Sequence, residues 1–221
     1  MSSATVPRYS RGEEIANSIT HGIGALLALG GFVVLTVLAA SHGNVWHLVS
    51  CAIFGTTLVF LYTASTLYHA VEGPRLKSLL RILDHTAILL LIAGTYTPFT
   101  LGSLRGPWGW SLFAIIWGLA VAGIIFETTR LRRFRAGLLT LYLVMGWLAI
   151  AAVKPLLAAI DGGGLQLLLA GGLAYTGGVV FYLWRGLPYH HAVWHLFVLA
   201  GSILHYFAVL LYVIPITGSL H

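Results

Sequence analysis

Long apolar runs alternate with short polar segments along almost the whole chain. Seven of these runs reach or exceed the roughly 18 residues that an α-helix needs to cross a membrane. They cover about residues 17–40, 45–70, 80–103, 107–127, 137–159, 164–186 and 190–216. Because the connections between them are short, neighbouring helices are expected to run antiparallel. The pattern predicts an all-α polytopic membrane protein: a polar tail over residues 1–16, then a single seven-helix transmembrane domain over residues 17–221.

Composition strengthens this assignment. The chain is 58% hydrophobic and 8% charged, whereas a soluble domain carries about 25% charged residues. The first apolar run is longer than the 7–15 residues of a signal-peptide core, so it is expected to be a retained helix. One cysteine, Cys51, excludes an intramolecular disulfide and a metal site built from several cysteines.

Lysine and arginine are unequally distributed between the two predicted sides of the membrane. Only Arg105 and Lys154 fall on the side opposite the N-terminus. The other ten are Arg8, Arg11, Arg75, Lys77, Arg81, Arg130, Arg132, Arg133, Arg135 and Arg185. Since basic residues favour the cytoplasmic side, the N-terminus is predicted to be cytoplasmic and the C-terminus outside. Their location in short loops beside helices points to anionic lipid headgroups as the partner, and not to nucleic acid.

This topology gathers polar residues at the cytoplasmic ends of four predicted helices. His191 and His195 begin the last helix and are four residues apart, so they share a helix face and can hold one metal ion. His69 ends the second helix and Asp84 begins the third. His21 lies in the first turns of the first helix, on the same side. The charge pattern therefore predicts a polar cluster at one membrane depth.

Three members of this region have structural alternatives. Asp84 is expected to be functional because an ionisable group inside a span is costly, but it could instead reach water or pair with Arg81. The Ser65 hydroxyl shares a helix face with His69, and it could serve the site or bond to a carbonyl of its own helix. His21 could line the site or cap the start of its helix.

Three other histidines are expected to lie apart from the cluster. His85 and His190 point about 100° away from their neighbours around the helix, so an interfacial position is favoured for both. His205 lies about 15 Å deeper than His195 and off its face, so a packed, hydrogen-bonded histidine is expected.

The combined motifs resemble a known superfamily. Ser65-x-x-x-His69, Asp84 followed by His85, and His191-x-x-x-His195 look like the seven-helix superfamily of progestin and adiponectin receptors, alkaline ceramidases and hemolysin III proteins. Residues 13–22, 65–69, 83–85 and 93–99 resemble its bacterial hemolysin III branch, which implies a bacterial inner-membrane location. The cytoplasmic N-terminal extension of the eukaryotic receptors is missing, which argues against hormone-receptor behaviour.

The resemblance also implies roles for the clustered residues. In that superfamily three histidines bind zinc near the cytoplasmic face and an aspartate holds a zinc-bound water. Carried over to this sequence, His69, His191 and His195 become zinc ligands and Asp84 becomes the water partner.

Three imidazoles that leave a fourth position open are typical of catalytic zinc. The favoured function is a zinc-dependent hydrolase of lipid amide or ester bonds, or another protein of membrane lipid homeostasis, with catalytic roles for Asp84 and Ser65. The alternatives are a non-enzymatic sensor of lipid state with structural zinc, a cytolytic protein as the family name suggests, and a cation transporter. The scarcity of ionisable residues within the spans argues against a wide channel.

Overall fold

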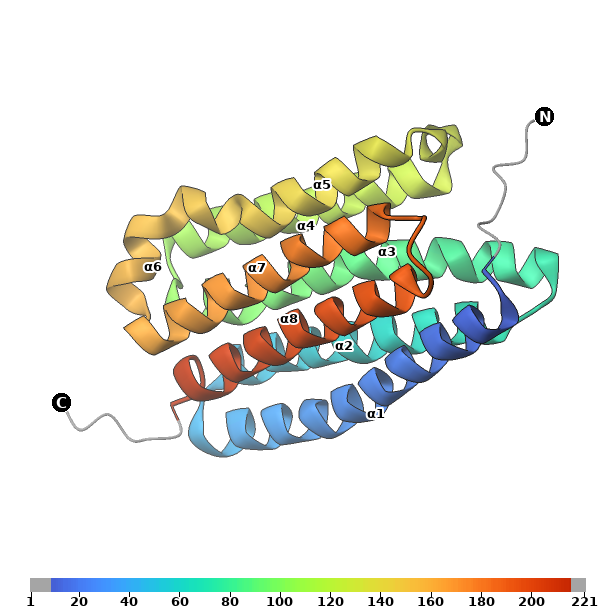
Figure 1. Ribbon diagram of the computed structural model, residues 1–221. Coiled ribbons are helices and arrows are strands. Elements are labelled where there is room, and N and C mark those ends of the chain that lie inside the picture. The colour runs from blue at the N-terminus through green and yellow to red at the C-terminus, as the bar shows by residue number, and fades with distance from the viewer. Residues whose placement is uncertain (1–8, 216–221) are drawn as a thin grey trace.

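The structure is a computed structural model that describes residues 9–215, and every regular element in that range is a helix (Figure 1). The elements are α1 (Arg11–His42), α2 (Val45–Ala70), α3 (Pro74–Pro98), the π-helical turn η1 (Phe99–Ser103), α4 (Pro107–Thr128), the 3₁₀ turn η2 (Arg130–Arg133), α5 (Arg135–Trp147), the 3₁₀ turn η3 (Leu148–Ala152), α6 (Val153–Ala159), α7 (Gly162–Leu183) and α8 (His190–Tyr212). Arg8, the first half of the predicted tail and the end of the last predicted span at residue 216 lie outside the described residues.

Six helical segments are long and apolar enough to cross a membrane, which confirms a polytopic helical membrane protein. They are α1, α2, α4, the segment Ala136–Ala159, α7 and α8. The remaining predicted span corresponds to α3, a helix of 25 residues that carries Arg81, Asp84 and His85 and is not among the six. The seven-span count therefore stays a prediction.

The first helix begins earlier than expected, at Arg11 instead of residue 17. The reason is a capping box: Glu13 N–H donates to Ser10 Oγ at 3.3 Å, and Ser10 N–H donates to Glu13 Oε2 at 2.8 Å. Residues 11–16, which were assigned to the polar tail, thus belong to a helix. This places Glu14 and Asn17 on the same helix as His21.

Two further boundaries differ from the predicted spans because of prolines. α3 starts at Pro74, not residue 80, since proline is well suited to the first helical turn. Arg75 and Lys77, expected in a loop, therefore lie in that helix. The predicted span over residues 137–159 corresponds to one membrane-length segment, Ala136–Ala159. Its α-helix is interrupted by the 3₁₀ turn η3, just before Pro155. Proline lacks an N–H and clashes with the carbonyl four residues earlier, so a regular α-helix cannot continue through it.

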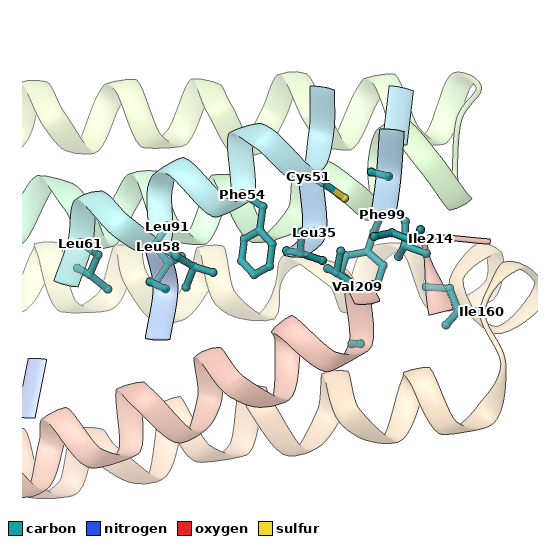
Figure 2. Close-up of a cluster of buried hydrophobic side chains, with 14 of the residues drawn as sticks. Leu35, Cys51, Phe54, Leu58, Leu61, Leu91, Phe99, Ile160, Val209 and Ile214 are labelled. Carbon is teal, nitrogen blue, oxygen red and sulfur yellow. The ribbon is translucent and has the colours of Figure 1, made fainter. Parts of the chain in front are cut away.

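The helices form one elongated bundle in which α3 lies between α2 and α4 (Figure 1). α1 packs along α2, α7 packs along α8, and α3 contacts α2, α4 and α5. Leu58 of α2, Leu91 of α3 and Val209 of α8 belong to one buried apolar cluster, part of which Figure 2 shows. The ends of α2, α4 and α7 and the starts of α3, α5 and α8 meet at the end of the bundle where the N-terminus lies.

Close packing of α1 on α2 requires a glycine at position 24. A Cβ atom added to Gly24 would lie 2.6 Å from Cδ1 of the buried Tyr62 ring, whereas one added to Gly30 of the same helix meets no atom within 4 Å. We expect Gly24→Ala to destabilise the protein by about 1–3 kcal/mol through overpacking, and Gly30→Ala to be neutral or slightly stabilising. Thermal unfolding in detergent checks this pair. Equal melting temperatures for the two variants would contradict the packing argument.

Candidate metal centre

Three histidines from two helices converge at the N-terminal end of the bundle. His69 lies in the last turn of α2, and His191 and His195 lie in the first two turns of α8. Their ring centroids are 4.5 Å apart for the α8 pair and 5.1 and 5.2 Å apart between His69 and His191 and between His69 and His195. One nitrogen from each ring lies within 4.8 Å of one from each of the others, and all three residues are buried. The geometry therefore fits a single metal ion.

Helix α1 orients two of these rings. His69 Nδ1 donates to Glu14 Oε2 at 2.7 Å, and Lys77 Nζ contacts the other oxygen of Glu14 at 2.8 Å. Since Nδ1 carries the proton, His69 Nε2 holds a lone pair, and this buried atom has no hydrogen-bond partner within residues 9–215. A carboxylate behind a histidine is the usual support of a metal ligand, because it fixes the tautomer and raises the basicity of the ring.

His195 has the same kind of support from a backbone carbonyl. Its Nδ1 lies 3.2 Å from the Asn17 carbonyl oxygen and 3.1 Å from Thr20 Oγ1. Because a carbonyl can only accept, Nδ1–H is the donor and Nε2 holds the lone pair. His191 Nδ1 is buried and without a hydrogen-bond partner in the described part of the chain. The donor set is thus three neutral imidazoles, which suits zinc.

Two aromatic contacts enclose the centre. The Tyr9 ring stacks on His191, with centroids 5.1 Å apart and planes 25° apart, and it also lies 5.9 Å from His69. On the inner side, the His21 ring stacks on His195 at 3.5 Å. Both His21 ring nitrogens are buried and lack a hydrogen-bond partner among the residues that the structure describes. His21 therefore lines the site and does not cap its helix.

Asp84 and Ser65 lie in the wall of a cavity that reaches the metal centre through His191 and His195. Asp84 is 8% exposed and forms no ion pair with Arg81, so neither structural alternative describes it. Ser65 Oγ is buried and makes no hydrogen bond to its own helix within the described ranges, and its hydroxyl interacts with the Asp84 carboxylate. Both side chains thus face the cavity with polar atoms that a ligand can engage.

Three further histidines lie outside the three-nitrogen cluster, although two of them, His85 and His205, line the same cavity. His85 Nδ1 lies 3.0 Å from Oε1 of the buried Glu127, and His190 Nδ1 donates to the Phe181 carbonyl at 3.0 Å. His205 Nε2 donates to the Leu168 carbonyl at 3.1 Å, which confirms the prediction of a hydrogen-bonded histidine.

The cavity extends from the histidines deep into the bundle between α3, α5, α7 and α8. Its polar end carries Ser65, Asp84, His191 and His195. Its middle is lined by aliphatic side chains of several helices, namely Leu61, Ile88, Leu91, Leu138, Leu143 and Val198. Gly146, an exposed residue of α5, also lines it. Sequence patterns could not have predicted this space, because it depends on how side chains fill the gaps between helices.

The fold and the site together define the class of this protein. It is a polytopic helical membrane protein whose buried three-histidine cluster, a candidate metal centre, faces a largely apolar cavity. A family model described as "Haemolysin-III related" matches residues 9–206. The chain belongs to this haemolysin III family, as its motifs suggested.

Named relatives cover most of the chain. Hemolysin-3 of Bacillus cereus is 52% identical over 203 residues, which are 92% of this chain and 93% of that protein. The Hemolysin-3 homolog of Bacillus subtilis (strain 168) is 50% identical over 204 residues, or 92% and 96% of the two chains. Monocyte to macrophage differentiation factor of Homo sapiens is 33% identical over 205 residues, or 89% and 83%.

Glu14 was not predicted as a site residue, because it falls within the predicted polar tail over residues 1–16. The Ser10-x-x-Glu13 capping box was the signal that could have found it, since a helix starting at Arg11 places Glu14, Asn17 and His21 along one face.

We expect Glu14→Gln to weaken metal binding by about 10–100-fold, because the charge that supports His69 is lost. Competition with a chelator of known affinity measures the change. Glu72→Gln is the matched control, since it removes the same charge from an exposed residue of the α2–α3 connection. The supporting role is wrong if the two variants bind metal equally well.

Proposed function

We propose that this protein binds zinc through His69, His191 and His195 and hydrolyses amide or ester bonds of membrane lipids, or otherwise serves membrane lipid homeostasis. The observation that carries the proposal is the buried cluster itself: nitrogens of three imidazoles lie within 4.8 Å of one another. Three protein ligands leave a fourth position for a reactant, as in catalytic zinc sites.

Bound zinc supplies Lewis acidity and brings the pKa of water toward about 7. The chain's own residues supply the rest of the chemistry. Asp84 accepts the proton of the attacking water, a role that a buried carboxylate facing the cavity can perform. Ser65 donates its hydroxyl hydrogen to the substrate carbonyl oxygen as negative charge develops there.

The cavity supports a lipid as the substrate. Its walls are aliphatic between the polar end and the bundle interior, which suits an acyl chain. Because Gly146 of α5 both lines the cavity and is exposed, we propose that a lipid enters from the bilayer beside this residue. The scissile bond then lies beside His191, His195 and Asp84, with the chain extending into the bundle.

Incubation of purified, zinc-loaded protein with amide-linked and ester-linked lipids tests this function. We expect release of free fatty acid from at least one lipid class, loss of release on chelation, and recovery when zinc is restored. Metal analysis of the same preparation should give about one zinc per chain. Zinc-loaded protein that releases no fatty acid from any lipid class would contradict the hydrolase.

The second candidate is a non-enzymatic sensor of lipid state in which zinc is structural. It is favoured by the contacts of α1, whose Glu14 and Asn17 bond to histidines of α2 and α8. A metal at this point ties three helices together, and Asp84 would complete its coordination. The name of the Bacillus cereus relative suggests a third candidate, a cytolytic protein.

We also propose seven spans, with α3 as the seventh, in a bacterial inner membrane with the N-terminus cytoplasmic. The basic residues support this orientation, and α3 can carry polar side chains because it contacts α2, α4 and α5 inside the bundle. Cysteines introduced at Arg130 and Arg105 should be labelled from the inside and from the outside, respectively. Labelling of position 130 from the outside contradicts the orientation and the cytoplasmic location of the site.

A further inference from the structure

The deep end of the cavity contains a second polar group, far from the metal centre. His205 of α8 and Tyr175 of α7 both line this end, and their rings lie 5.5 Å apart. Ten residues of α8 separate His205 from His195, which is about 15 Å along the helix axis. The aliphatic middle of the cavity lies between the two polar ends. None of the chemistry at the metal centre uses this second group.

His205 presents a hydrogen-bond acceptor that the protein does not use. Its Nε2–H donates to the Leu168 carbonyl at 3.1 Å, so Nδ1 of the neutral ring carries the lone pair. This Nδ1 is buried and has no hydrogen-bond partner between residues 9 and 215. The ring is fixed in place, since an added Cβ at Gly171 would lie 2.5 Å from its Nε2 atom. A buried acceptor left unpaired costs about 1–3 kcal/mol, so a partner for it is expected.

The neighbouring hydroxyl groups hold a complementary donor. Tyr62 O–H donates to Ser202 Oγ at 2.8 Å, and Tyr175 and Ser202 share a second contact of 2.8 Å. That second contact uses the hydrogen of either Tyr175 or Ser202. The hydroxyl hydrogen of whichever residue does not donate in this contact has no acceptor within the described residues. We call these residues the deep hydroxyl cluster (Tyr62, Tyr175, Ser202), and Tyr175 is its member that lines the cavity. When Ser202 donates to Tyr175, the Tyr175 hydroxyl hydrogen is free to donate one more hydrogen bond into the cavity.

We propose that His205 and the deep hydroxyl cluster bind a hydroxyl group carried by the apolar part of a lipid in the cavity. A hydroxyl is the group that matches both features, because it donates to His205 Nδ1 and accepts from the cluster. An unsubstituted acyl chain can fill the same space but leaves His205 unpaired. The site thus selects for acyl chains that are hydroxylated about 15 Å from their polar end. This inference rests on the proposed lipid-binding cavity.

Equilibrium binding of two labelled fatty acids to the full-length protein in detergent tests the inference. The probes are octadecanoic acid and a hydroxyoctadecanoic acid with its hydroxyl group about two-thirds of the way along the chain from the carboxylate, which matches the spacing of the two polar ends. We expect the hydroxylated acid to bind about 2–10-fold more tightly, the range for one net hydrogen bond. His205→Phe should abolish this preference while it retains affinity for the plain acid.

Tyr206→Phe is the matched control, because Tyr206 is the next residue of α8 but donates to the Gly31 carbonyl of α1, away from the cavity. It should keep the preference. Equal affinity of the unmodified protein for the two acids would overturn the hydroxyl site while leaving the proposed lipid cavity standing. A preference that survives in His205→Phe would also overturn it. If neither acid binds, the hydroxyl site and the proposed lipid cavity both fail.

Discussion

Replacement of His191 and His195 together by alanine is expected to abolish stoichiometric zinc binding. The pair supplies two of the three nitrogens that converge in the centre, and the remaining His69 offers one. Loss of a supporting residue alone lowers metal affinity by about 10–100-fold, so loss of two direct ligands should exceed that range by far. Metal analysis of the purified variant, together with chelator competition on each single variant, measures the effect.

His205→Ala is the control for this prediction. It removes a buried histidine from the same helix, but that histidine bonds to Leu168 and stands about 15 Å from His195. Its zinc content should match that of the unmodified protein. Full zinc occupancy in the double variant would show that the metal is held elsewhere.

Asp84→Asn is expected to retain zinc but to lower turnover of a lipid substrate by about 10²–10⁴-fold. The amide has nearly the shape of the carboxylate but cannot accept a proton from water, and general-base catalysis contributes a factor of this size. Ser65→Ala should likewise reduce the rate much more than it reduces metal content, because the proposed role of its hydroxyl is toward the substrate oxygen. Fatty acid release and metal analysis on the same samples give both quantities.

The same variant separates the two leading functions. If zinc is structural, Asp84→Asn should lower zinc retention or the melting temperature, with no activity to lose. Chelation of the unmodified protein should then produce a clear loss of thermal stability and no change in lipid products. Unchanged turnover in Asp84→Asn would remove Asp84 from the chemistry.

Much of the site was predictable because helix periodicity acts locally. The four-residue spacing of His191 and His195 predicts a shared face, and the structure has both rings on it, 4.5 Å apart. The proximity of His69 to this pair could be predicted from the topology, since the end of α2 and the start of α8 lie at the same end of an antiparallel bundle. Apolar runs likewise predicted the positions of most helices.

What was missed depends on local helix signals or on side-chain packing. Glu14 was placed in a tail because the apolar run begins several residues after the start of the helix. The helix itself starts at the Ser10 capping box. The break before Pro155 was overlooked because hydropathy continues unchanged across it. The partners of Glu127 and His205 come from other helices, so no spacing along the chain could have revealed them.

The candidate metal centre joins helices from the two ends of the described chain. Asn17 and His195, whose contact orients a ligand, are separated by 178 residues of sequence. Polypeptides emerge from the ribosome at about 5–20 residues per second, so α1 and α2 wait many seconds for α8. Until then His69 offers a metal ion one nitrogen. At the proposed zinc site, loading would therefore follow insertion of α8, and a loaded chain would be one whose membrane assembly has been completed.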